Sequence, residues 1–73
     1  MSVGQKNIAS EHLAMAADHL DRAASQYRDA AKSYDAGDDQ KGAHHAFAAH
    51  GECVLAQDHE REASKYHAGE HGA

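Results

Sequence analysis

The sequence contains no proline, no tryptophan and only one cysteine. A single cysteine cannot form a disulfide within one chain, and its presence is typical of proteins of the reducing cytoplasm. No basic segment precedes an apolar run, so we expect no secretory signal, and no stretch approaches the length of a membrane-spanning helix. These absences predict a cytoplasmic protein that does not cross a membrane.

Large apolar side chains are also scarce. Hydrophobic residues make up 41% of the 73 residues, but 17 of the hydrophobic residues are alanine. Alanine buries little area, and even full burial of a leucine or phenylalanine contributes only about 1.5–3 kcal/mol. Such a core would hardly offset the conformational entropy lost by one isolated helical hairpin. We therefore expect the chain to associate with itself.

Positive charge is in the minority. Seven Lys and Arg residues stand against twelve Asp and Glu residues, which gives a formal charge of −5. This balance argues against binding to nucleic acids and to anionic membrane surfaces. Protonation of all eight histidines would change the formal charge from −5 to +3. We expect the surface charge to change sign on mild acidification, as a general response to pH or as an evolved pH sensor.

The most regular feature of the sequence is a run of apolar residues between positions 13 and 34. They recur at alternating steps of four and three, an unbroken pattern over three heptads. This pattern is typical of a helix that packs along its length against other helices. We call this set the apolar stripe, and it consists of Leu13, Ala17, Leu20, Ala24, Tyr27, Ala31 and Tyr34.

The sequence predicts a single domain over residues 1–73, made of two helices. The first helix is expected over about residues 5–35 and the second over about residues 39–68, with a turn at residues 36–38. A turn this short forces the two helices to run antiparallel.

Several residues have the chemistry of helix caps. Three residues could begin the first helix: Ser2, Asn7 and Ser10. Gly37 can take the left-handed conformation that ends a helix. Either Asp38 or Asp39 can then cap the second helix.

The second helix carries a broader apolar band, which includes Phe47, Val54 and Leu55. Folding the chain about the turn pairs residues whose numbers sum to roughly 74, so that Tyr27 meets Phe47 and Leu20 meets Val54. The sequence therefore predicts an all-α protein, a two-helix antiparallel hairpin that dimerises into a four-helix bundle.

The second helix begins with a histidine-rich segment, Asp38-Asp39-Gln40-Lys41-Gly42-Ala43-His44-His45-Ala46, followed by Ala49-His50. With this segment the chain resembles small Ala- and His-rich helical-hairpin proteins from bacterial genomes, whose function is uncharacterised. The resemblance implies a bacterial origin and a helical hairpin, and it implies no particular activity.

The eight histidines are the strongest chemical signal, because imidazole is the commonest protein ligand for zinc, copper and nickel. His12, Met15 and His19 are spaced at i, i+3 and i+7. They share a face with Ile8 that we expect to lie opposite the apolar stripe. Methionine beside histidine would suit copper, whereas a second packing face is the alternative interpretation of the same four residues.

A second candidate metal site is the pair His50 and Cys53, one helical turn apart, which could supply a nitrogen and a thiolate. The alternative is a core histidine beside an inert, buried cysteine. We expect His44 and His45 to be solvated. No cofactor is implied with certainty.

The sequence does not predict an enzyme or any catalytic residue. The spacing of His50 and Cys53 suggests a base and a nucleophile, but no orienting group, Gly-rich loop or oxyanion site accompanies them. We expect a structural or interaction module whose partner is itself, as a homodimer or higher oligomer, or an unknown protein. The alternative is a Zn-, Cu- or Ni-binding protein that uses histidines from more than one helix or subunit. A third possibility is an assembly that protonation of His50 would loosen.

Overall fold

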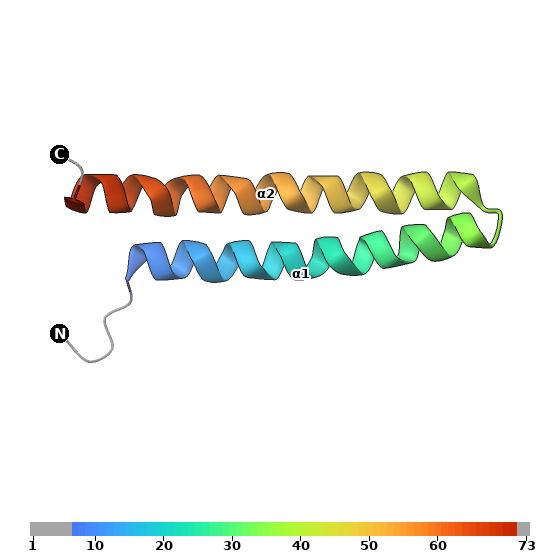
Figure 1. Ribbon diagram of the computed structural model, residues 1–73, viewed down its shortest axis with the longest axis horizontal. Coiled ribbons are helices and arrows are strands. Elements are labelled where there is room, and N and C mark those ends of the chain that lie inside the picture. Colours follow the sequence, from blue (N-terminus) through green and yellow to red (C-terminus); the bar gives the residue numbers. More distant parts are fainter. Residues whose placement is uncertain (1–6, 72–73) are drawn as a thin grey trace.

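The chain forms two long α-helices that run antiparallel and are joined by a tight turn (Figure 1). The computed structural model describes residues 7–71, apart from the side chains of residues 67 and 69–71. Helix α1 spans Ile8–Asp35 and helix α2 spans Asp39–His71, and the longest dimension is 54 Å. The predicted all-α hairpin of two packed helices is confirmed over the described residues.

Helix α1 is capped by Asn7, whose backbone is extended. The side-chain oxygen of Asn7 accepts a hydrogen bond from the backbone nitrogen of Ser10, 3.1 Å away. This bond satisfies one of the amide groups that the first turn of a helix leaves without a partner. Of the other two candidate caps, Ser10 lies inside the helix and Ser2 lies outside the described residues.

The turn between the helices is a Schellman motif. Gly37 has a φ of 82°, in the left-handed region that favours glycine. Its amide donates to the carbonyl of Tyr34, and the amide of Asp38 donates to the carbonyl of Ser33, the two bonds that define the motif. The carboxylate of Asp38 then accepts a bond from the amide of Lys41 and caps α2.

The core between the helices is made of small residues that recur every seven positions. They are Ala16, Ala23 and Ala30 from α1, and Gly42, Ala49, Ala56 and Ala63 from α2. No large side chain is fully buried among the described residues. Small side chains allow two helix backbones to approach closely, so this repeat determines which faces of the helices meet.

Beside the turn, the ring of Tyr34 lies over Gly42. A Cβ atom placed on Gly42 would come within 2.7 Å of the Tyr34 ring, well inside van der Waals contact. Glycine at this position therefore provides the space that the aromatic ring occupies.

The apolar stripe is not the core of this hairpin. Leu13 is 54% exposed, Tyr27 is 48% exposed, and Phe47, the predicted partner of Tyr27, is 80% exposed. Leu20, Tyr34, Val54 and Leu55 are also exposed. Two helices in one layer bury only the narrow strip between them, and the repeat of small residues occupies that strip. Packing of the stripe against a helix of another chain stays a prediction.

The predicted register between the helices also needs correction. We call the surface along which α1 and α2 pack the seam. Three polar pairs bridge it: His12 with His59, His19 with Glu52, and Gln26 with His45. The residue numbers of each pair sum to 71 rather than 74. The turn lies where the sequence predicts it. The sum of the paired residue numbers differs because the helices meet through other faces than the predicted ones.

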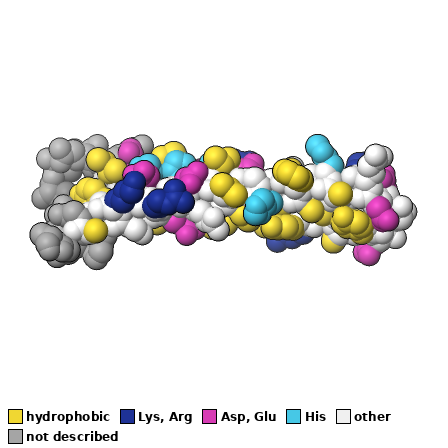
Figure 2. Space-filling model, turned by 90° about the horizontal axis from the view of Figure 1, so that it is seen from above, with side chains coloured by type: hydrophobic (Ala, Val, Ile, Leu, Met, Phe, Trp, Pro, Cys, Tyr) yellow, Lys and Arg dark blue, Asp and Glu magenta, His cyan; other side chains and the backbone are white. Residues whose placement is uncertain are grey.

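Hydrophobic side chains are consequently spread over much of the surface of the rod (Figure 2). Neither described helix combines the length and the apolar character that crossing a membrane would require.

Candidate functional site

Polar side chains alternate with the small residues along the seam between the helices. They also recur every seven positions, and all are half-buried. Each lies three residues after a small residue of the core, except His12, which lies four residues before Ala16. We call this set the polar ladder, and it consists of His12, His19, Gln26 and Ser33 from α1, and His45, Glu52, His59 and Tyr66 from α2. Because a step of three residues stays on the same side of a helix, the seven-residue repeat brings the ladder to the seam together with the alanines.

At the end of the hairpin far from the turn, His12 of α1 meets His59 of α2. Their Nδ1 atoms are 2.9 Å apart, and their ring centroids are 5.2 Å apart. At this distance one nitrogen donates a proton and the other accepts it, so the pair shares a single proton between the two nitrogens. The ring of His19 stacks on that of His59, with centroids 5.6 Å apart and an interplanar angle of 14°.

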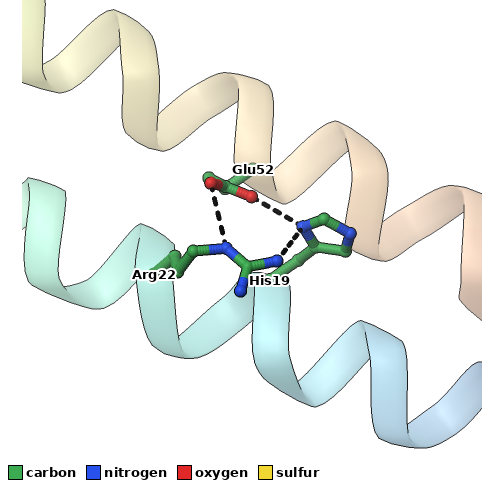
Figure 3. Close-up of polar contacts among 3 residues, drawn as sticks. All are labelled: His19, Arg22 and Glu52. Atoms are coloured by element: carbon green, nitrogen blue, oxygen red, sulfur yellow. Dashed lines mark hydrogen bonds and ion pairs between the residues drawn. The ribbon is translucent and has the colours of Figure 1, made fainter.

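About two turns further along the seam, His19, Arg22 and Glu52 form a polar cluster (Figure 3). The Nδ1 atom of His19 lies 2.6 Å from Oε1 of Glu52, and the Nε atom of Arg22 lies 3.2 Å from Oε2. A carboxylate only accepts, so His19 donates from Nδ1. The terminal nitrogen of Arg22, 3.0 Å from the same Nδ1, is then a close contact rather than a second hydrogen bond.

These contacts lower the pKa of Glu52 below its ordinary value of 4.5. The hydrogen bond from His19 has the largest effect, partial desolvation opposes it, and the positive charge of Arg22 adds to the lowering. Glu52 is therefore a carboxylate at neutral pH and holds one side chain from α1 on each of its oxygens.

Closer to the turn, Nδ1 of His45 lies 2.6 Å from the side-chain oxygen of Gln26. The expectation that His45 is solvated is therefore wrong, because this histidine is half-buried and bonded across the seam. His44, the neighbouring residue, points away from the seam and is exposed.

The first predicted metal cluster is only partly assembled. His12 and His19 lie in the seam, so the expectation that their face points away from the packing surface is wrong. Met15 remains on an exposed flank, 40% accessible. His59 and Glu52, which the sequence analysis did not select, are the residues that α2 brings to this place.

The second predicted cluster does not form a site either. His50 is exposed, whereas Cys53 is half-buried. The Sγ atom of Cys53 lies 4.0 Å from the hydroxyl of Tyr27, and this contact raises the pKa of Tyr27. Over the side chains that the structure describes, no three His, Cys, Asp or Glu residues are grouped so that they could hold a metal ion.

A signal for the polar ladder is present in the sequence. His12 and His19 are seven residues apart, and so are His45, Glu52 and His59. A search at this spacing, rather than at one helical turn, would have selected both histidines of the pair. Comparison with protein-family models, with curated proteins and with solved structures finds no match for this chain.

Proposed function

We propose that the protein is a non-enzymatic, self-associating helical module, in which two hairpins pack through their apolar stripes into a four-helix bundle. The observation that carries the proposal is the exposure of nearly every large apolar side chain on a hairpin whose own core is built from alanine and glycine.

The hairpin alone has little to hold it together. Its buried hydrophobic residues are six alanines, and no large side chain is fully removed from water in the described part. Small domains usually need a larger core, a crosslink or association with another chain. Cys53 is a free thiol, which leaves association as the source of further buried area.

A second copy of the same chain is the partner that the stripe fits best. Its large members, Leu13, Leu20, Tyr27 and Tyr34, recur every seven residues, and alanines lie between them. In a two-fold arrangement, the large side chains of one stripe face the alanines of the other, as knobs face holes in a coiled coil. No charged residue interrupts the stripe from Leu13 to Tyr34.

Helix α2 extends the same surface. The contact between Tyr27 and Cys53 places this flank of α2 beside the stripe. Val54 follows Cys53 directly, and Phe47 lies one heptad before Val54, and both are exposed. A partner that covers the stripe would therefore cover part of α2 as well, as four-helix packing requires.

The proposal is tested by measuring the mass of the particle in solution by analytical ultracentrifugation over a range of concentrations. We expect the wild type to sediment at twice the chain mass of 7.8 kDa. Leu20→Asp should dissociate it and reduce its helicity, because association would bury an unpaired charge.

Ser25→Asp is the matched control, since it adds the same charge at an exposed position outside the stripe. It should leave the mass unchanged. A wild type that sediments as a single chain at high micromolar concentration would contradict the proposal. Equal association of wild type and Leu20→Asp would show that another surface is used.

A further inference from the structure

We propose that His12 and His59 form a binding site for one divalent transition-metal ion of the zinc class, held between the two helices. The two imidazoles come from different helices and are 47 positions apart in the sequence. The site is distinct from the apolar stripe, and it does not depend on association of the chains.

The positions of the two rings fit a tetrahedral ion. Zinc binds an imidazole nitrogen at about 2.0–2.1 Å, which places the centroids of two such rings about 5.2 Å apart. The centroids of His12 and His59 are 5.2 Å apart. The two Nδ1 atoms point at one another, 2.9 Å apart, and a rotation of each ring by about 35° would turn both lone pairs toward one ion and open this distance to about 3.4 Å.

Neighbouring side chains hold the site in place and set its charge. His19 stacks on His59, and His19 is itself bonded to Glu52, so two further residues fix the orientation of the His59 ring. The charge of Glu52 is balanced by Arg22. Near the pair in sequence, Asp58 is ion-paired with Arg61 and Glu62 with Lys65. The exposed carboxylates of Glu11 and Glu60 favour the approach of a cation.

The protein supplies two ligands at this site. Within the described side chains, no third His, Cys, Asp or Glu residue completes the arrangement, so water fills the remaining positions. Both rings are half-buried rather than enclosed, which leaves a path for the ion and room for these waters. With two protein ligands, this shell differs from a closed structural zinc site, which has four.

Besides the rotation of the two rings, binding requires a change of tautomer. The neutral pair shares one proton between its Nδ1 atoms, and the ion needs both of these lone pairs. The proton therefore moves to the Nε2 atom of the histidine that carried it, and no net proton is released when both rings start neutral. At acidic pH protons compete for the same nitrogens, so affinity falls.

The test is a calorimetric titration of chelator-stripped protein with Zn²⁺ at neutral pH, with helicity measured by circular dichroism for each variant. We expect one ion per chain. His12→Gln and His59→Gln should each weaken binding by about tenfold or more, since even residues that only support a metal site contribute this much. Long-range ¹H–¹⁵N spectra of the wild type should show that zinc binds through Nδ1 of these two residues.

Two control variants separate this site from the other histidines. His44→Gln removes an exposed imidazole from α2, and a variant lacking His67 and His71 removes the pair near the end of the chain. Both should bind zinc as the wild type does. Unchanged affinity in a folded His59→Gln variant, or loss of binding in either control, would overturn the proposal.

Discussion

Helix α1 carries two surfaces that repeat every seven residues, and they have opposite surroundings. The seam surface, with Ala16, Ala23 and Ala30, is buried against α2. The apolar stripe, with its leucines and tyrosines, is exposed. The comparison shows that the largest apolar side chains are not the buried ones in a hairpin of one layer. Small residues permit the closest approach of the helices, and the larger ones remain exposed on the flank.

The largest loss of stability is expected from a larger side chain placed in the seam between the helices. Ala56 is fully buried, and Ala56→Leu would force the helices apart along a face that has no spare volume. Overpacking of this kind usually costs 1–3 kcal/mol, and we expect a loss of about 3 kcal/mol in the free energy of unfolding. Urea unfolding followed by circular dichroism measures this loss.

Ala17→Leu provides the comparison for that variant, since it makes the same change on the exposed stripe. In a single hairpin it should leave the free energy of unfolding within about 0.5 kcal/mol of the wild type. In the proposed dimer it should weaken association, because the added volume would crowd the large side chain that faces Ala17. Equal destabilisation by the two substitutions would mean that the seam and the stripe are packed alike.

An effect of intermediate size on stability is expected when two glycines of α2 are replaced by alanine. At Gly51, which is exposed, a Cβ atom would meet nothing within 4 Å, so Gly51→Ala should stabilise the helix by about 0.5–1 kcal/mol. Gly42→Ala should lose this gain, because its Cβ atom would displace the ring of Tyr34. We expect thermal unfolding to place Gly42→Ala at least about 1 kcal/mol below Gly51→Ala.

If Gly51→Ala instead weakened association, the surface around Gly51 would be part of the contact between chains. Measuring the mass of this variant together with its stability therefore distinguishes a free surface from a covered one.

The smallest expected effect is a change in how the free energy of unfolding depends on pH, through Glu52 of the polar ladder. The pKa of Glu52 is lowered in the folded state, so its stabilising contribution is present above the ordinary value of 4.5 and is lost as pH falls through the folded value. Glu52→Gln should remove this part of the pH dependence. The free energy of unfolding of both proteins, measured from about pH 6 to about pH 3, gives the comparison.

The contributions of titratable groups that do not contact Glu52 largely cancel in the difference between the two proteins. A difference that stays constant over this range would show that the bonds to His19 and Arg22 do not depend on the charge of Glu52.

Local features of the fold could be predicted from the sequence. Gly37, followed by an aspartate, specifies a helix end and a new cap within three residues, and these interactions involve neighbouring residues alone. The antiparallel arrangement follows from the short turn. Asn7 was one of three candidate caps, and the sequence offered no means of choosing among them.

The buried face could not be chosen in the same way. Leucine and tyrosine at heptad spacing are typical of a core, and the energy gained by burying them depends on which chains are present. The deciding pattern was the match between two repeats of small residues, Ala16 to Ala30 on one helix and Gly42 to Ala63 on the other.

Prediction of the candidate site depended on choosing the same buried faces of the two helices. Once the alanine repeats are aligned, His12 faces His59 and His19 faces Glu52 without further information. The close ring geometry, by contrast, depends on the distance between the helix axes, which the sequence does not give directly.

The position of the turn has a consequence for the order in which the hairpin closes. The contact between Gln26 and His45 spans 19 residues, whereas that between His12 and His59 spans 47. Closing the longer loop costs roughly 0.8 kcal/mol more in chain entropy if it forms alone. Folding is therefore expected to begin beside Gly37 and to proceed outwards, so that the histidine pair forms late and separates early. Any ligand that joins these two rings would act at the end of the molecule where the helices come apart most readily.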